Sequence, residues 1–296
     1  MKVLVVGASG FIGRALVDRL VAEGCTVDAW DRRGGKSTAQ VRRVAVDLLA
    51  DGPLRAPDGT PWQAAFHLAA HALPGAVWTR ALVIENLQMT ARVLEHLATH
   101  APGCLTVVAS SGHVYAPSDS PLTEDSPIGP LRPYGLSKQL SENWALSMRM
   151  RLRVQIVRAF NQIGPGMAAG LLIPDVLKLV AKRSDDPLVM NGRDDWKDFL
   201  DWRDAMDAYW RLLHTEAPSG SVWNLCSGRC TRVSSLVRTI LDEQKVERDI
   251  RFADPAAETL IGDPGKLMRA TGWTPRRTLQ DTVRALFAQT TTPHTP

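Results

Sequence analysis

The sequence predicts an α/β fold with a doubly wound parallel sheet, followed by a smaller α/β region. Short valine-rich runs alternate with amphipathic stretches over the first 160 residues, and the runs are mostly apolar, as in strands buried on both faces. A glycine-rich turn joins the first run to the first amphipathic stretch. We therefore expect one domain at 1–160 and a second at 161–296, with part of 195–215 returning to the first.

The first domain shows its strands and helices in alternating order. We expect strands at 3–6, 26–30, 43–46, 64–68, 105–109 and 154–159, and helices at 11–23, 85–100 and 133–150. The first helix carries Leu16, Leu20 and Val21 at helical spacing, and the third begins on Pro133, which favours a helix start.

The second half is less regular, because glycines and prolines interrupt it after residue 161. We expect helices at 174–183 and 234–243. The last residues, 290–296, are polar with two prolines, and we expect them to fray.

Composition narrows the class of protein. With 45% hydrophobic and 22% charged residues, the chain is that of a globular protein. The net charge of +4 is scattered, which indicates a solvated surface or a weak attraction for an anionic substrate such as a phosphate ester. The sequence has no basic stripe with interleaved aromatics, so it does not predict nucleic-acid binding. No apolar run approaches the roughly 20 residues that span a bilayer.

The cysteines predict neither a metal site nor disulfide bonds. Only Cys226 and Cys230 lie close together, and neither Cys25, Cys104 nor a nearby histidine completes a zinc set. The apolar run in the first ten residues is too short for a signal peptide and ends in a glycine loop. We therefore expect a cytoplasmic protein with reduced thiols and no metal.

The glycine-rich turn has the sequence Gly-Ala-Ser-Gly-Phe-Ile-Gly at 7–13, between the first strand and the first helix. Glycines there allow a tight turn and a close approach of the backbone to a pyrophosphate, and the helix amino terminus offers free N–H groups. This context predicts a dinucleotide-binding, or Rossmann, domain. The expected contacts are Gly7, Ser9, Gly10, Phe11, Ile12 and Gly13.

The end of the second strand bears on the choice of cofactor. Asp31 there predicts hydrogen bonds to the adenosine ribose of NAD, whereas the following Arg32 would suit the extra phosphate of NADP. Because Asp31 closes the strand, we favour NAD(H) over NADP(H). Asp47 and Leu48, after the third strand, are candidates for the adenine end, although Asp47 is equally interpretable as a loop or capping acid.

Tyr134 and Lys138 lie four residues apart at the start of the third helix, so both side chains share one face. The ammonium, and the charge of an oxidised cofactor, would lower the phenol pKa from its usual value of about 10. Tyr134 could then exchange a proton with a carbinol oxygen, while Lys138 also binds the nicotinamide ribose. Ser111 follows a strand, at the sheet edge where ligands bind, and could hydrogen-bond the same oxygen.

These residues resemble the extended branch of the short-chain dehydrogenase/reductase superfamily, which acts on nucleotide sugars. The resemblance covers almost the whole chain and rests on the glycine loop, FHLAA at 66–70, TEDSP at 123–127 and PYGLSK at 133–138. It implies a catalytic triad of Ser111, Tyr134 and Lys138. It also implies cofactor contacts at Leu68, Ala69 and Ala70.

The second half most resembles the GDP-4-keto-6-deoxy-mannose reductases within that branch. The similar segments are RAFNQIGPG at 158–166, LIPD at 172–175, KDFLDWRD at 197–204, WNLCSG at 223–228, IGD at 261–263 and ATGW at 270–273. The resemblance implies a nucleotide-diphosphate sugar as substrate, bordered by His71, Ser111, Gly112, His113, Asn161, Lys197 and Arg203. Lys197 stands where relatives usually carry arginine, so it keeps the charge but loses the bidentate fork.

Two functions remain open from the sequence: reduction of a nucleotide-diphosphate 4-keto-6-deoxyhexose, and epimerisation with a tightly bound, recycled NAD. A dehydratase is disfavoured, because Gly112 and His113 stand where that mechanism places its acids. His113 is either a proton donor tuned near neutrality or a residue packed over the cofactor. The intact triad disfavours a non-catalytic sensor, and the resemblance implies a homodimer formed through the helices at 85–100 and 133–150.

Overall fold

The computed structural model describes residues 1–54, 61–72, 80–182, 186–254 and 257–290. Its centre is a sheet of seven strands, all of them parallel to their neighbours. In spatial order these are β11 (Ser221–Leu225), β6 (Arg153–Ala159), β5 (Leu105–Ser111), β4 (Ala64–His67), β1 (Lys2–Val6), β2 (Thr26–Asp31) and β3 (Val41–Ala45). The order reverses between β1 and β4, as in doubly wound sheets.

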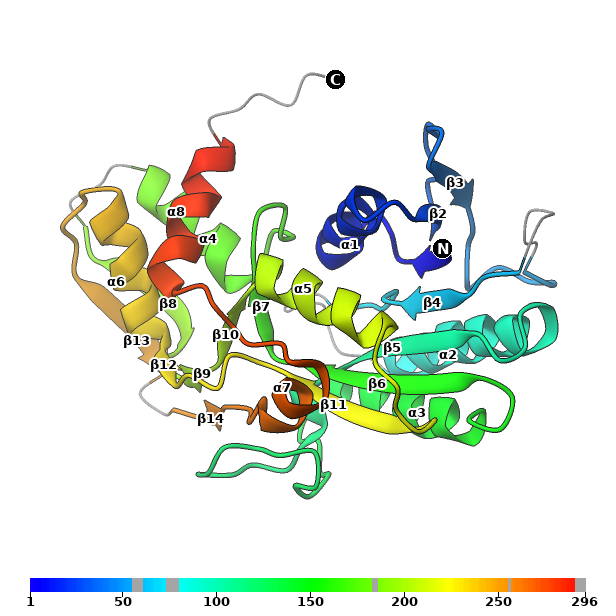
Figure 1. The fold of residues 1–296 in the computed structure, drawn as a ribbon. Coiled ribbons are helices and arrows are strands. Elements are labelled where there is room, and N and C mark those ends of the chain that lie inside the picture. Colours follow the sequence, from blue (N-terminus) through cyan, green and yellow to red (C-terminus); the bar gives the residue numbers. More distant parts are fainter. Residues whose placement is uncertain (55–60, 73–79, 183–185, 255–256, 291–296) are drawn as a thin grey trace.

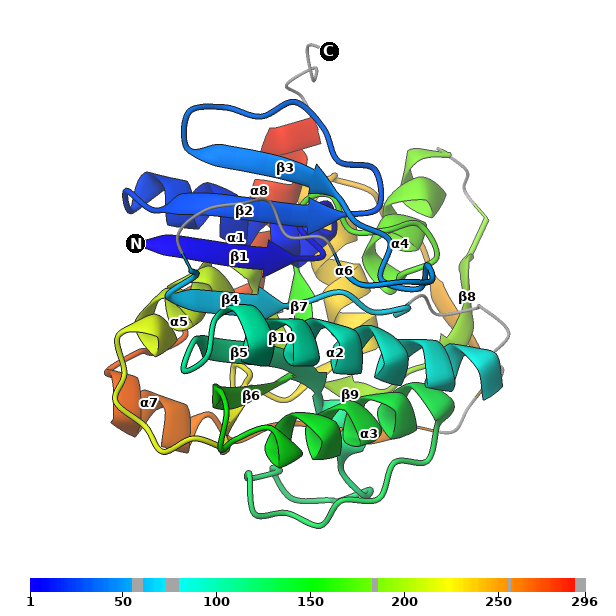
Figure 2. The ribbon, with the colours of Figure 1, turned by 90° about the vertical axis from the view of Figure 1, so that its right-hand side faces the viewer.

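Helices cover both faces of this sheet (Figures 1 and 2). One face carries α2 (Arg80–His100) and α3 (Pro133–Ser147), which lie side by side in Figure 2, and the other carries α1 (Phe11–Ala22) and α5 (Trp202–Leu213). Alternate residues of β1 point to opposite faces, so Val3 and Val5 enter the core beneath α1 while Leu4 and Val6 enter the core beneath α2. The predicted fold class is confirmed.

The rest of the second half forms a smaller unit at one end of the sheet (Figure 1). Its helices are α4 (Leu172–Ala181), α6 (Val233–Glu243) and α8 (Leu279–Thr290), which share one hydrophobic core. Short strands pair around them: β7 (Asn161–Ile163) with β10 (Phe199–Asp201), β8 (Leu188–Arg193) with β13 (Ile250–Asp254), and β9 (Trp196–Lys197) between β12 (Thr231–Arg232) and β14 (Thr259–Leu260).

Every strand and helix expected before residue 160 is present, with shifted ends. The helix expected at 85–100 begins at Arg80, the helix expected at 133–150 ends at Ser147, and the strand expected at 43–46 begins two residues earlier, at Val41. The sequence pattern missed β11, α5 and the short helix α7 (Gly265–Thr271), although β11 completes the large sheet. The division into domains at residue 160 stays a prediction, and the expected fraying at 290–296 lies mostly outside the described residues.

Among the described helices, none combines the length and apolar character that crossing a bilayer requires. The four cysteines are free thiols. Within the described part of the chain, histidines, cysteines and carboxylates nowhere gather in a group that could hold a metal ion.

Candidate active site

Two adjoining cavities open where the central strands of the sheet end. The first, here the loop cavity, has a volume of about 330 Å³ and is bordered by the turn after β1 and the end of β2. The second, here the tyrosine cavity, has a volume of about 640 Å³ and is bordered by the ends of β5 and β6 and by α3. Leu68 and Ala70 line both, so one elongated ligand could occupy the two cavities together.

The glycine turn brings its backbone to the loop cavity. Gly7 has φ +89°, and a Cβ there would lie 2.7 Å from the amide nitrogen of Ala69. A Cβ on Gly13 would lie 2.1 Å from the carbonyl oxygen of Gly7, so this glycine lets α1 pack against the turn rather than lining a cavity. No side chain caps α1 at Gly10, which leaves its first amide groups available to a phosphate.

Asp31 presents an unsatisfied acceptor beside the loop cavity. Its Oδ1 accepts hydrogen bonds from the amides of Arg33 (2.9 Å) and Gly34 (2.8 Å), whereas its buried Oδ2 has no hydrogen-bond partner among the described residues. A buried carboxylate oxygen is stable only when something donates to it. The hydroxyls of an adenosine ribose would do so, and Arg32 lines the same cavity.

The other predicted cofactor residues divide between the two cavities. Ser9, Asp47, Leu48 and Ala69 line the loop cavity, whereas Phe11 and Ile12 line the tyrosine cavity. Asp47 also accepts a hydrogen bond from the Leu49 amide at 2.9 Å, so it acts as a loop acid as well.

Ser111, Tyr134 and Lys138 all line the tyrosine cavity, although Ser111 comes from β5 and the other two from α3. The phenol of Tyr134 hydrogen-bonds the Ser111 side chain. Lys138 is buried, donates to the carbonyl oxygen of Ala109 at 2.9 Å, and has its Nζ 5.9 Å from the centre of the Tyr134 ring. The structure therefore brings together the three residues that were expected to meet.

The expected lowering of the tyrosine pKa is wrong for the protein without its cofactor. Burial raises the pKa of Tyr134 to about 12, and the hydrogen bond with Ser111 opposes this only in part. Burial also lowers the pKa of Lys138 to about 8, against the raising effect of Glu142. The ammonium is directed at Ala109 rather than at the phenol, so its charge does not offset the loss of water.

A buried network, here the floor network, lies beneath Tyr134 and Lys138 and consists of Ser110, Glu142 and Arg158. Arg158 on β6 holds the Glu142 carboxylate of α3 through Nε (2.9 Å) and Nη2 (2.8 Å), and Ser110 on β5 donates to the same carboxylate. Burial alone would lower the pKa of Arg158, but the hydrogen bonds and charge of Glu142 outweigh it and raise the value. The network fixes α3, and so Tyr134, against two strands.

His113 lines the tyrosine cavity edge-on to Tyr134, with ring centres 6.1 Å apart. Burial, followed by the charges of Lys197 and Arg132, lowers its pKa to about 4. The imidazole is therefore neutral at pH 7, and a proton donor tuned near neutrality does not fit this geometry. Gly112 does not line the cavity, since a Cβ there would lie 2.9 Å from the Phe160 ring.

Asn161 and Lys197 also line the tyrosine cavity. Asn161 on β7 donates from Nδ2 to the carbonyl oxygen of Asp198 at 2.9 Å, and Lys197 lies on β9. Sequence reasoning missed several residues of this cavity: Arg132, Phe160, Gln162, Met167, Leu172, Phe199, Tyr209 and Leu260. Phe160, Gln162, Leu172 and Phe199 lie inside the motifs quoted for the second half, and Arg132 directly precedes Pro133 of another, which is the signal that could have found these five.

Two residues expected at the substrate lie elsewhere. The guanidinium of Arg203 pairs with Asp201 (Nη2 to Oδ2, 2.7 Å) and stacks over Trp202, and it borders neither cavity. His71 lines the loop cavity rather than the tyrosine cavity, where its amide donates to Asn86 Oδ1 at 2.7 Å. The segment 71–85 departs from the pattern of the resembled family, and its residues 73–79 lie outside the described residues.

A chain of ion pairs, here the rim network, edges the tyrosine cavity and consists of Arg132, Glu258, Arg193, Asp195 and Lys197. Arg132 pairs with Glu258 at 2.9 Å, and Glu258 pairs with Arg193 at 2.6 Å. Arg193 lies 3.5 Å from Asp195, whose other oxygen lies 3.3 Å from Lys197. Only Arg132 and Lys197 of this network line the cavity.

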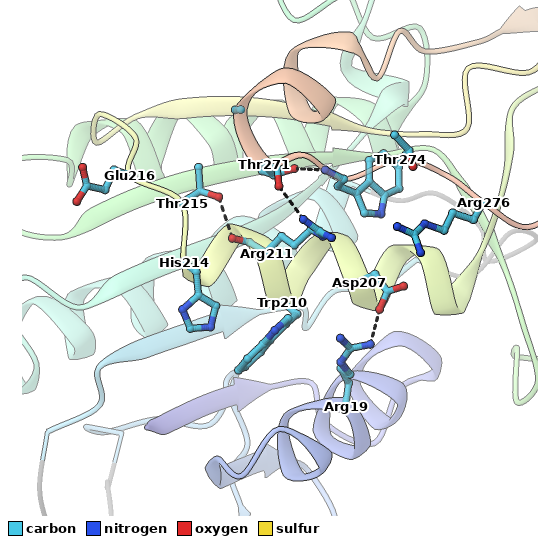
Figure 3. Close-up of a pocket in the computed structure, with 12 residues that line it drawn as sticks. Arg19, Asp207, Trp210, Arg211, His214, Thr215, Glu216, Thr271, Thr274 and Arg276 are labelled. Atoms are coloured by element: carbon cyan, nitrogen blue, oxygen red, sulfur yellow. Dashed lines mark hydrogen bonds and ion pairs between the residues drawn. The ribbon is translucent and has the colours of Figure 1, made fainter.

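A further cavity of about 770 Å³ lies between the last turns of α1 and α5 and the helix α7 (Figure 3). Two of its three arginines are already engaged, Arg19 with Asp207 and Arg211 with the carbonyl oxygen of Thr271. None of the residues expected to bind cofactor or substrate lines it. The candidate active site is therefore the pair of cavities at the strand ends.

Comparison with known proteins agrees with this geometry. Residues 3–226 match the model of the NAD dependent epimerase/dehydratase family. The chain is 30% identical to the GDP-6-deoxy-D-mannose reductase of Pseudomonas aeruginosa, in an alignment that covers 97% of this chain and 96% of that protein.

Two solved structures with bound cofactors have the same fold. MoeE5 in complex with UDP-glucuronic acid and NAD superposes with a TM-score of 0.84 at 26% identity, covering 98% of this chain and 99% of that one. RMD from Pseudomonas aeruginosa complexed with NADPH gives 0.81 at 27% identity, covering 97% of each chain.

Proposed function

This chain belongs to the NAD dependent epimerase/dehydratase family, and we propose that it reduces the 4-keto group of a nucleotide-diphosphate 4-keto-6-deoxyhexose, GDP-linked. It is an NAD(P)-dependent enzyme of the extended short-chain dehydrogenase/reductase type. One observation carries the proposal: Ser111, Tyr134 and Lys138 border a cavity that adjoins the glycine turn, and the cavity's other charged residues are cations suited to a diphosphate.

The loop cavity fits the adenosine and pyrophosphate end of a dinucleotide. The turn at Gly7 and the uncapped start of α1 suit a pyrophosphate, and the unpartnered Oδ2 of Asp31 suits a ribose diol. That carboxylate would repel the 2′-phosphate of NADP(H), so we propose NAD(H) as the preferred cofactor. When bound, the reduced cofactor supplies a hydride. Tighter binding of NADPH than of NADH in a fluorescence titration would overturn this preference.

The residues of the tyrosine cavity supply the proton and orient the sugar and the nicotinamide. Because burial holds the pKa of Tyr134 near 12, its phenol is protonated at pH 7 and can donate to the oxygen that becomes the carbinol. Ser111, which already hydrogen-bonds the phenol, can donate to the same oxygen. Lys138, anchored on Ala109, is placed to hold the nicotinamide ribose.

Epimerisation with a recycled NAD is the second candidate. It would use the same Ser111, Tyr134 and Lys138, and Asp31 suits a tightly held NAD. The two functions differ in stoichiometry, because only the reductase consumes reduced cofactor. A dehydratase remains disfavoured, since Gly112 and the neutral His113 provide no acid.

The decisive experiment incubates the enzyme with NADH or NADPH and a panel of GDP-, dTDP- and UDP-4-keto-6-deoxy sugars. We expect loss of the absorbance of the reduced cofactor in stoichiometric amount, fastest with a GDP sugar. Interconversion of sugar epimers without net cofactor consumption would replace the reductase by the epimerase. Neither reaction with any sugar would overturn both.

We also propose that the enzyme is a cytoplasmic homodimer. Ile84 on α2 and Leu136 and Trp144 on α3 are 54%, 41% and 37% exposed, and apolar residues on two adjacent helices suit a helix-to-helix contact with a second copy. The free thiols suit a reducing compartment. Light scattering that gives the mass of a monomer at micromolar concentration would contradict the dimer.

A further inference from the structure

Arg132, which lay outside the predicted site, borders the tyrosine cavity two residues before Tyr134. We propose that Arg132 is a specificity-determining residue that binds the substrate diphosphate together with Lys197 and supplies the bidentate contact that a lysine cannot. This inference rests on the proposed nucleotide-sugar substrate and deepens it. It assigns a binding role to a residue of the rim network.

The charge of the tyrosine cavity points to an anionic ligand. Its charged lining residues are Arg132, Lys138 and Lys197, and no carboxylate lines it within the described part of the chain. Lys138 is buried and directed at the Ala109 carbonyl, so it belongs to the catalytic end. Arg132 and Lys197 remain for the substrate, and both lie close enough to His113 to lower its pKa.

The two cations differ in what they offer a diphosphate. Lys197 is a point charge, already drawn to Asp195 at 3.3 Å, and it cannot bind two phosphoryl oxygens in one plane. The guanidinium of Arg132 has parallel N–H groups that match two oxygens. An arginine at 132 therefore offers the planar fork that is missing at 197.

Arg132 can exchange its present partner, Glu258, for a ligand with little loss of free energy. The side chains of Arg132 and Glu258 are 56% and 50% exposed, and ion pairs at such sites contribute about 0–1 kcal/mol. When Arg132 turns to a diphosphate, Glu258 keeps its pair with Arg193 at 2.6 Å. No charge is left without a partner, so the rim network can release Arg132 to the substrate.

The position of Arg132 also links binding to catalysis. It is the residue that precedes the first turn of α3, and Tyr134 lies within that turn. Lys197 comes from β9 in the other half of the chain. A diphosphate held between them would fix the sugar relative to the phenol, which makes Arg132 a determinant of substrate binding rather than of the chemical step.

The test measures binding of GDP, UDP and dTDP to the enzyme saturated with NADH, with guanosine as the ligand that lacks phosphate. We expect Arg132→Ala to weaken the best nucleoside diphosphate about 10- to 100-fold, the range expected for a charged hydrogen-bonded contact. Guanosine and NADH should bind as they do to the wild type. With a turned-over sugar, KM should rise while kcat changes less than about threefold.

Rescue separates this role from a structural one. In the Arg132→Ala background, Lys197→Arg should recover at least part of the lost affinity, because it returns a fork to the cavity. The control is Arg238→Ala, which removes an exposed arginine of α6 that belongs to neither network and lines neither cavity, and it should leave affinity for the diphosphate unchanged.

Three results would overturn the inference. These are unchanged diphosphate affinity in Arg132→Ala, an equal loss for guanosine, and an equal loss in Arg238→Ala. Because the readout is binding, failure of every keto sugar to turn over would sink the proposed function while leaving this result intact. Absence of diphosphate binding to the wild type would sink both.

Discussion

The floor network and the rim network use the same pairing of arginine with glutamate in opposite surroundings. In the floor network, the side chains of Arg158 and Glu142 are 7% and 4% exposed and are joined by two hydrogen bonds. In the rim network, Arg132 and Glu258 are about half exposed and joined by one. The buried pair is fixed because either partner alone would be a buried charge, whereas either exposed partner can turn to water or to a ligand.

Because of this difference, we expect the two networks to have different roles in the site. The floor network holds α3 rigidly, so that Tyr134 and Lys138 keep their places beside the end of β5. The rim network presents cations that can change partners as substrate enters. We therefore expect changes near the floor to alter stability and kcat, and changes at the rim to alter KM.

The largest expected effect comes from Tyr134→Phe, which removes the proton donor and keeps the ring. We expect kcat to fall by about a thousandfold, within the range for loss of a general acid, while NADH binding stays the same. Stopped-flow reduction at saturating sugar measures the change. A kcat within tenfold of the wild type would remove Tyr134 from the chemistry.

Glu142→Ala breaks the floor network and should be the most damaging change to stability. It leaves the Arg158 guanidinium buried without its carboxylate, which should reduce the free energy of unfolding by about 3–5 kcal/mol. Urea unfolding measures this. Glu142→Gln, which keeps an acceptor, should lose less, and equal losses in the two variants would show that charge is not what matters there.

Acid should weaken the core beside the catalytic lysine through His67, which is 3% exposed. Burial, followed by the charge of Lys138, lowers the pKa of His67 to about 3. Since the unfolded chain takes up this proton below about pH 6.5 and the folded chain does not, stability falls as the pH drops. His67 alone should lower the free energy of unfolding by about 2 kcal/mol between pH 7 and pH 5.

The measurement compares urea unfolding of the wild type and His67→Asn at both pH values. The variant should show a smaller loss on acidification by about that amount, and His214→Asn, at an exposed position, should behave as the wild type. An identical loss in the wild type and in His67→Asn would show that this imidazole is not held neutral.

The smallest effect is expected at the rim, where Glu258→Ala removes the exposed partner of Arg132 and Arg193. The free energy of unfolding should change by less than about 1 kcal/mol, in contrast to Glu142→Ala. A loss as large as that of Glu142→Ala would erase the distinction between floor and rim.

How much of the site could be predicted depended on whether its residues are neighbours in the sequence. The glycine turn, Asp31 and the Tyr134–Lys138 pair are short-range patterns, and the order of buried strands and helices made the parallel sheet predictable. The strand β11 was missed because it follows α5 and a short loop, which the sequence pattern also missed, and its place at the sheet edge depends on pairing with β6, which no local pattern encodes.

The sequence by itself determined the doubly wound sheet, the glycine turn and the choice of Ser111, Tyr134 and Lys138 as candidate catalytic side chains, because each rests on local periodicity, spacing or a short motif. Only the tertiary structure decided the pKa directions of Tyr134 and His113, the position of Arg203 outside both cavities, and the presence of Arg132 inside one. These depend on burial and on contacts between residues far apart in the chain, and water is excluded from a site only once the whole chain has folded around it.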